Sequence, residues 1–139
     1  MRQAAGLART AALARAEREL TLICFTGYRL ERLRNHPPAP GVPELLAEVD
    51  VLIDGRYVAA FNNGRGLRGS TNQRVHHLSD RIRPEDYDFE NRPRTVEVAI
   101  SASELTIIGI PPNGLLDSID MATEQEWRIP FHDGREIVS

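Results

Sequence analysis

The pattern of apolar and polar positions divides the first half of the chain into alternating helices and strands. Residues 20–25 form a nearly continuous apolar run, and residues 51–53 form a second one. Such runs are typical of parallel strands that are covered on both faces. Two helices are predicted between them, over residues 28–34 and 43–49, the second with proline in its first turn. This order predicts an α/β fold with a parallel sheet or barrel.

The N-terminal segment has two interpretations. Residues 1–16 contain arginines and no acidic residue, as organellar targeting peptides do. However, Leu7, Ala11 and Ala14 lie at helical spacing, and the high alanine content favours a helix. Because the segment runs into the first strand without a linker, we favour a packed helix.

The second half of the chain has a different pattern. After a glycine-rich loop, residues 72–78 are predicted to form a helical turn. Residues 95–100 and 104–110 alternate between apolar and polar positions, which predicts a β-hairpin closed by residues 101–104.

The C-terminal segment from Leu115 is mixed and weakly patterned, and Trp127, Ile129 and Phe131 are candidates to cover an apolar surface. We therefore predict a main domain over residues 1–114 and a tail over residues 115–139.

Composition narrows the classes of function. With 139 residues the chain fits one domain that can bury a core. Its net charge of −3 gives no attraction to nucleic acid or anionic lipid, so neither nucleic acid nor a membrane is an expected partner. No apolar run reaches the roughly 18 residues of a membrane span. The single cysteine, Cys24, excludes internal disulfides and predicts a cytoplasmic protein.

Asp54 and Arg56 are the first candidates for binding chemistry. Both directly follow the second apolar strand, and ligands of parallel α/β folds lie at the carboxyl ends of strands. An acid and a base together could bind the ammonium and the carboxylate of an aminoacyl group. The alternative is an exposed ion pair, which contributes about 0–1 kcal/mol.

The loop that contains Arg68, Ser70 and Asn72 is the second candidate. Its glycines permit close backbone approach, and its hydroxyl and amide side chains could cap a helix whose N-terminus attracts anions. The alternative is a capped loop with solvated arginines. No aromatic ladder accompanies these arginines, so the loop does not resemble a nucleic-acid site.

No catalytic residue and no metal ligand emerges from the remaining chemistry. The four histidines are scattered or adjacent rather than at ligand spacing, and we expect them to be solvated or hydrogen-bonded. Cys24 lies inside an apolar strand and is expected to be a core residue.

Three segments, read in order, resemble a known family. They are Leu22-Ile23-Cys24-Phe25-Thr26-Gly27-Tyr28, Asp50-Val51-Leu52-Ile53-Asp54-Gly55-Arg56-Tyr57 and Gly66-Leu67-Arg68-Gly69-Ser70-Thr71-Asn72-Gln73-Arg74. Together they resemble the C-terminal half of a radical S-adenosylmethionine (radical SAM) activating enzyme, of the kind that activates anaerobic ribonucleotide reductase. The resemblance covers about residues 1–110.

The resemblance implies a fold, a cofactor and a set of site residues. The fold would be a fragment of a partial parallel (β/α) barrel, followed by a C-terminal β-hairpin. S-adenosylmethionine would bind near Thr26, Asp54, Arg56, Arg68, Ser70 and Asn72. A complete family member cleaves S-adenosylmethionine reductively at a 4Fe-4S cluster and abstracts hydrogen from a glycine of its partner enzyme. The CxxxCxxC motif that holds this cluster is not in the sequence, so we expect this chain alone to be inactive.

Several roles remain open at this point. In the first alternative, a preceding coding segment was lost or is carried separately. The partners would then be an N-terminal half and a glycyl-radical enzyme. Otherwise the chain is a non-enzymatic interaction module or a small-ligand binder that kept the fold. In either case the first strand would leave an exposed edge that favours self-association.

Overall fold

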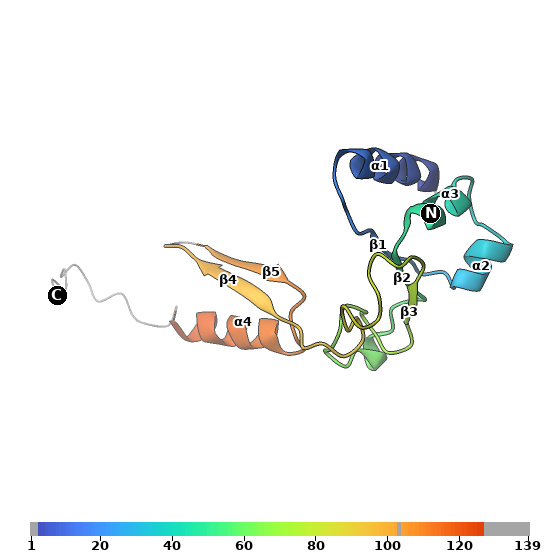
Figure 1. Ribbon diagram of the computed structural model, residues 1–139. Coiled ribbons are helices and arrows are strands. Elements are labelled where there is room, and N and C mark those ends of the chain that lie inside the picture. The colour runs from blue at the N-terminus through green and yellow to red at the C-terminus, as the bar shows by residue number, and fades with distance from the viewer. Residues whose placement is uncertain (1–2, 103, 127–139) are drawn as a thin grey trace, which may run out of the picture. The chain divides into compact units, whose positions relative to one another are not determined.

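The computed structural model describes residues 3–102 and 104–126. The chain divides into two compact units, Met1–Arg94 and Thr95–Ser139, whose elements are labelled in Figure 1. The division lies 20 residues before the boundary that the sequence predicts at residue 114.

The first unit contains a three-stranded sheet with the order β1-β2-β3. Strand β1 (Ile23–Phe25) pairs in parallel with β2 (Val51–Asp54), so that Phe25 lies opposite Ile53. The parallel pairing predicted for the two apolar runs is therefore confirmed. The described residues contain helices and strands but no closed barrel.

The third strand corrects the sequence prediction for residues 72–78. Instead of a helical turn, the structure has β3 (Arg74–His77), which pairs antiparallel with β2 and places Arg74 opposite Asp54. Strand β2 is buried along its whole length, so its backbone groups need partners on both sides. Strand β3 supplies the partners on the side away from β1.

Strand β1 is shorter and more exposed than predicted. It has three residues rather than six, and Phe25 keeps 53% of its surface exposed. Ile23 and Cys24 of β1 are half-buried and Phe25 is exposed, whereas every residue of β2 is buried. The expectation that both apolar runs are covered on both faces therefore holds for β2 alone.

Three predicted helices are confirmed, as α1 (Ala4–Glu17), α2 (Leu30–Asn35) and α3 (Val42–Glu48). A short 3₁₀ helix, η1 (Ala59–Phe61), follows β2. The core joins α1, α2, α3 and β2 through the following buried side chains: Ala4, Ala8, Leu30, Leu33, Val42, Leu45, Val49 and Leu52.

The packed face of α1 differs from the prediction. Ala4 and Ala8 are buried, whereas Leu7 is 52% exposed. The reason lies at Gly41, which has φ of 82° and where a Cβ would lie 2.5 Å from the backbone of Ala5. Such close approach of helix and loop admits only small side chains, so alanines and not leucines occupy this face.

The second unit contains a hairpin and a helix. Strands β4 (Val96–Ile100) and β5 (Leu105–Gly109) pair antiparallel, which confirms the predicted hairpin. Helix α4 (Leu115–Glu126) occupies part of the segment that showed only weak patterning in the sequence. Trp127, Ile129 and Phe131 lie outside the described residues, as does Ser103 of the predicted turn. None of the described helices has the length and apolar character needed to cross a membrane.

Candidate functional site

A buried aspartate lies at each end of the central strand β2. Asp50, just before the strand, accepts a hydrogen bond from the amide of Leu22 (2.8 Å) and is contacted by Arg15 and by the Ser79 hydroxyl. Asp54, the last residue of the strand, is fully buried. Asp50 ties α1 to the sheet, and Asp54 lies at the end where a ligand is expected.

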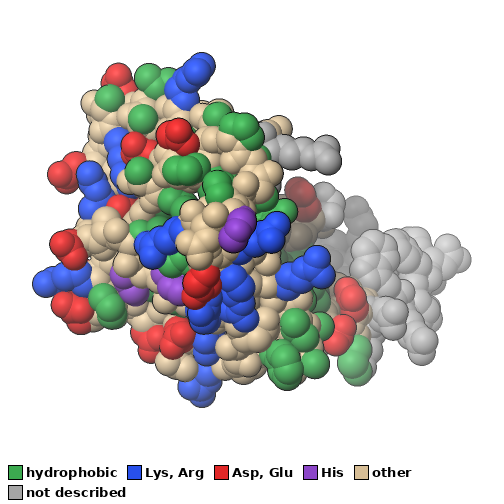
Figure 2. All heavy atoms as spheres, turned by 90° about the vertical axis from the view of Figure 1, so that its right-hand side faces the viewer, with side chains coloured by type: hydrophobic (Ala, Val, Ile, Leu, Met, Phe, Trp, Pro, Cys, Tyr) green, Lys and Arg blue, Asp and Glu red, His purple; other side chains and the backbone are tan. Residues whose placement is uncertain are grey.

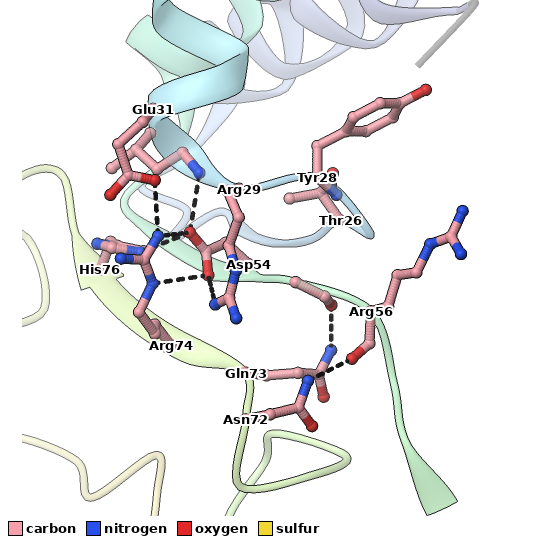
Figure 3. A network of polar contacts seen from close by, with 12 residues as sticks. Thr26, Tyr28, Arg29, Glu31, Asp54, Arg56, Asn72, Gln73, Arg74 and His76 are labelled. Atoms are coloured by element: carbon pink, nitrogen blue, oxygen red, sulfur yellow. Dashed lines mark hydrogen bonds and ion pairs between the residues drawn. The ribbon is translucent and has the colours of Figure 1, made fainter.

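Asp54 is the centre of a polar network that Figure 3 shows. Its Oδ1 accepts a hydrogen bond from Arg29 Nη1 (3.0 Å), and its Oδ2 accepts one from Arg74 Nη2 (2.8 Å). The amide of Leu30 at the start of α2 (2.8 Å) and Nε2 of His76 on β3 (2.9 Å) also contact Oδ2. The carboxylate therefore joins β2, β3 and the loop before α2.

These contacts determine the ionisation of Asp54. Burial by itself raises the pKa of a carboxyl group, but hydrogen bonds from Arg74, the Leu30 amide, Arg29 and His76 outweigh burial and hold the pKa of Asp54 well below its usual range. The pKa of Arg74 is raised, first by its hydrogen bond to Glu31 and then by Asp54. Both partners therefore remain charged at physiological pH.

Arg56 does not face Asp54. Its side chain is exposed and points away from the network in Figure 3. The guanidinium group of Arg56 has no hydrogen bond or ion pair with the part of the chain that the structure describes. The alternative of an exposed Asp54–Arg56 ion pair is wrong, because the Asp54 carboxylate is buried and occupied by other partners.

Thr26, Gly27 and Tyr28 lie beside the turn that contains Arg56. The amide of Thr26 donates to the carbonyl of Ile53 (3.0 Å), and the amide of Gly55 donates to the carbonyl of Tyr28 (3.1 Å). The Oγ1 of Thr26 accepts from the amide of Tyr28 (3.2 Å), which closes the turn. The carboxyl ends of the two parallel strands are thus joined into one surface.

The side chains of Arg68 and Ser70 stabilise the glycine-rich loop by hydrogen bonds. Arg68 Nη1 donates to the carbonyls of Thr71 (3.3 Å) and Gln73 (3.2 Å) and forms an ion pair with Glu90 (3.0 Å). The buried hydroxyl of Ser70 accepts from the amide of Val58 (3.1 Å). No helix follows the loop in the described part of this unit, so the helix that these residues were expected to cap does not form.

Asn72 connects the loop to the strand end. Its Nδ2 donates to the carbonyl of Arg56 (2.8 Å), while its Oδ1 is buried and has no hydrogen-bond partner in the described part of the chain. Of the six predicted site residues, the structure brings Thr26, Arg56 and Asn72 to one end of the sheet. Asp54 is buried in its own polar network, and Arg68 and Ser70 stabilise the glycine-rich loop.

Two residues that sequence reasoning missed hold this region together. Gln73 donates through Nε2 to the carbonyl of Gly55 (2.8 Å) and accepts through Oε1 from the amide of Gly69 (2.9 Å). Arg94 donates to the carbonyls of Gly66 (3.0 Å) and Arg68 (2.9 Å). Gln73 belongs to the third segment of the resemblance, but no role was assigned to it there. Arg94 lies 26 residues from Arg68, so no local spacing relates the two.

Many exposed side chains of the first unit are charged. Figure 2 shows arginine and acidic side chains interleaved over one face, with histidines among them. His76 contacts Asp54, and Nδ1 of His77 lies 2.8 Å from the carbonyl oxygen of Ile82. The expectation that these two histidines are hydrogen-bonded agrees with these contacts.

One comparison with known proteins gave a match. A family model described as a 4Fe-4S single cluster domain matches residues 1–76. The chain belongs to this family. No curated protein and no solved structure matches the chain. Membership relates the first unit to iron–sulfur proteins, and the matched region contains β1, β2 and the Asp54 network.

The residues present do not fit the cluster that the family is named for. A 4Fe-4S cluster is held by cysteine thiolates, usually four, and the sequence contains only Cys24. Burial raises the pKa of the Cys24 thiol, which disfavours the thiolate that metal binding requires. Among the side chains that the structure describes, in residues 3–102 and 104–123, no three His, Cys, Asp or Glu side chains are grouped as metal ligands.

Proposed function

We propose that the chain provides the S-adenosylmethionine-binding part of a radical SAM glycyl-radical-activating enzyme that resembles the activating protein of anaerobic ribonucleotide reductase. Membership of the 4Fe-4S single cluster family supports a relation to iron–sulfur proteins. The observation that carries the proposal is the junction of the Thr26–Tyr28 turn with the Asp54–Arg56 turn. This junction lies at the carboxyl ends of a parallel strand pair, where α/β folds bind ligands.

In this proposal Arg56 is the residue that touches the ligand. Its guanidinium group is exposed and free of contacts with the described residues, so it can receive the carboxylate of an aminoacyl group. Thr26 accepts a hydrogen bond from the amide of Tyr28, and Asn72 donates one to the carbonyl of Arg56. These two contacts hold the backbone near Arg56 in place. Asp54 is a positioning residue, because its carboxylate is already shared among Arg29, Arg74, His76 and the Leu30 amide.

The proposal assigns no cluster ligand to these 139 residues. In a complete enzyme, the cysteines would come from another segment or from a separately encoded N-terminal half. The edge of β1 is the place where a strand of that half would pair, since β1 has a neighbour on one side only in the described sheet. The second partner would be the glycyl-radical enzyme that the complete enzyme activates.

Isothermal titration of the purified chain with S-adenosylmethionine and with S-adenosylhomocysteine tests the proposal. We expect weak binding of both ligands, reduced by about 1.5–3 kcal/mol in Arg56→Ala, as is typical when a charge-assisted hydrogen bond is lost. Arg65→Ala is the matched control, because Arg65 is another exposed arginine of the same unit and has no assigned role. Absence of binding in the folded chain, or equal affinity of Arg56→Ala and the unaltered chain, would overturn the proposal.

A second candidate function is a non-enzymatic interaction or small-ligand binding module derived from the same fold. The observation that favours it is the cysteine content, since a cluster cannot be built from Cys24 alone. A folded chain that binds no S-adenosylmethionine but still forms complexes would support this second function.

A further inference from the structure

Tyr28 presents an aromatic ring beside Arg56, the residue that we assign to ligand binding. The amide of Tyr28 donates to Oγ1 of Thr26 (3.2 Å), and its carbonyl accepts from the amide of Gly55 (3.1 Å). Both backbone groups are thus fixed at the junction of the two turns, while the side chain is 40% exposed. Among the described residues, no aromatic or cationic side chain stacks on this ring. The ring is therefore held in place through its backbone and is accessible to a ligand.

Gly27 leaves the surface between Tyr28 and Arg56 open. The φ of Gly27 is not positive, so the backbone conformation does not require glycine at this position. Apart from its chain neighbours, a Cβ there would meet only Cγ of Arg56, at an ordinary van der Waals distance of 3.8 Å. Figure 3 shows the side chains of Tyr28 and Arg56 both extending away from the Asp54 network. A ligand bound to Arg56 would therefore lie next to the Tyr28 ring.

Charge identifies the ligand group that fits this ring. In the proposed function, on which this inference rests, Arg56 binds the aminoacyl carboxylate of S-adenosylmethionine. A short aliphatic chain joins that carboxylate to the sulfonium, so the sulfonium must also lie near the junction. Asp54 cannot receive this cation, because its carboxylate is buried and already hydrogen-bonded. The face of an aromatic ring attracts a cation within about 6 Å of its centre, and the exposed ring of Tyr28 provides such a face.

We propose that Tyr28 is a specificity-determining residue whose ring binds the sulfonium of S-adenosylmethionine through a cation–π contact. The aminoacyl carboxylate pairs with Arg56, and the sulfonium lies over the face of the ring. S-adenosylhomocysteine carries a neutral thioether at the same position, so it gains no such contact. Arg56 therefore contributes to the affinity for both ligands, whereas Tyr28 favours the cationic ligand over the neutral one.

Isothermal titration of the full chain with both ligands tests the proposal. The quantity of interest is the dissociation constant of S-adenosylhomocysteine divided by that of S-adenosylmethionine. Tyr28→Leu should lower this ratio roughly 2- to 5-fold, by weakening the binding of S-adenosylmethionine alone. Tyr28→Phe keeps the ring and should keep the ratio. Tyr57→Leu is the matched control, because Tyr57 is also exposed but its ring packs against the backbone of Gly69, where a Cβ would lie 2.8 Å from Cδ2 of Tyr57.

Saturation-transfer NMR gives a second readout of the same contact. Irradiation of the tyrosine ring protons should saturate the S-methyl protons of bound S-adenosylmethionine, because that methyl group is attached to the sulfonium. The transfer should be largely lost in Tyr28→Leu and retained in Tyr57→Leu. Circular dichroism of each variant checks that the fold is intact, and the unaltered chain gives the signal even if a variant does not fold.

The outcomes separate this inference from the proposed function. If neither ligand binds the folded chain, the proposed function is overturned, and this inference with it. If both ligands bind and Tyr28→Leu leaves the ratio unchanged, the role of Tyr28 is wrong while the proposed function stands. An equal fall of the ratio in Tyr28→Phe and Tyr28→Leu would also overturn the inference, because the hydroxyl and not the ring would then be responsible. Absence of saturation transfer to the S-methyl protons of a bound ligand would do the same.

Discussion

The carboxylate of Asp54, at the end of the buried strand β2, accepts a hydrogen bond of 2.8 Å from Arg74, which lies opposite it on β3. This pair links β2 to β3 at the end of the sheet where the candidate site lies. Arg29 binds the other oxygen of the same carboxylate at 3.0 Å. One buried carboxylate therefore holds together the strands and the loop on which the candidate site is built.

Replacing Asp54 by alanine should strongly destabilise the first unit. Removing one member of a buried ion pair leaves uncompensated charge, which typically costs 3–5 kcal/mol. We expect a loss at the lower end of that range, because Arg29 and Arg74 are each 45% exposed and can regain water. The measurement is urea unfolding followed by circular dichroism. Asp86→Ala, which removes an exposed pair with Arg83, should leave the unfolding free energy nearly unchanged.

The same carboxylate should make stability depend on pH in the acid range. Because the pKa of Asp54 is lower in the folded chain than in the unfolded chain, its contribution is fully present above the unfolded value of about 3.9. The contribution is lost as the pH falls below that value toward the folded pKa. Asp54→Asn should therefore show a shallower loss of stability than the unaltered chain between about pH 4 and pH 2. Parallel profiles for the two proteins would contradict this assignment.

Gly66→Ala should disrupt the loop that Arg68 and Arg94 hold. Gly66 has φ of 65°, and a Cβ there would lie 2.3 Å from the carbonyl oxygen of Phe89. A backbone shift is required in addition to the strained φ, so we expect a loss of roughly 1–3 kcal/mol in unfolding free energy. Gly6→Ala is the control, since its Cβ would meet nothing within 4 Å on helix α1, and alanine there should be neutral or stabilising.

Anaerobic reconstitution of the purified chain with iron and sulfide should leave no stable cluster. The reason is that Cys24 is the single cysteine, and even a dimer would provide only two thiolates. Iron and sulfide analysis with visible absorbance measures the outcome, and Cys24→Ser should behave as the unaltered chain does. A stoichiometric 4Fe-4S signal, lost in Cys24→Ser, would show that this prediction is wrong.

Local pattern was sufficient for much of the fold. The helix predicted over residues 28–34 forms as α2, with Leu30 and Leu33 buried. The apolar run at residues 51–53 became the buried strand β2, and alternation after residue 95 became the hairpin. Each of these signals depends on neighbours within a few positions, which is the range over which periodicity is readable.

The organisation of the site depended on contacts between distant residues. Asp54 was predicted to bind a ligand together with Arg56, two positions away, but Arg29 and Arg74, 25 and 20 residues away, occupy its carboxylate. Residues 72–78 were predicted to form a helical turn, yet residues 74–77 form β3 because the buried strand β2 needs backbone partners on its second side. The sequence by itself determined which segments are apolar and what chemistry their ends carry. Only the tertiary structure decided which charges meet, because a buried carboxylate takes the donors that the fold brings to it, whatever their separation along the chain.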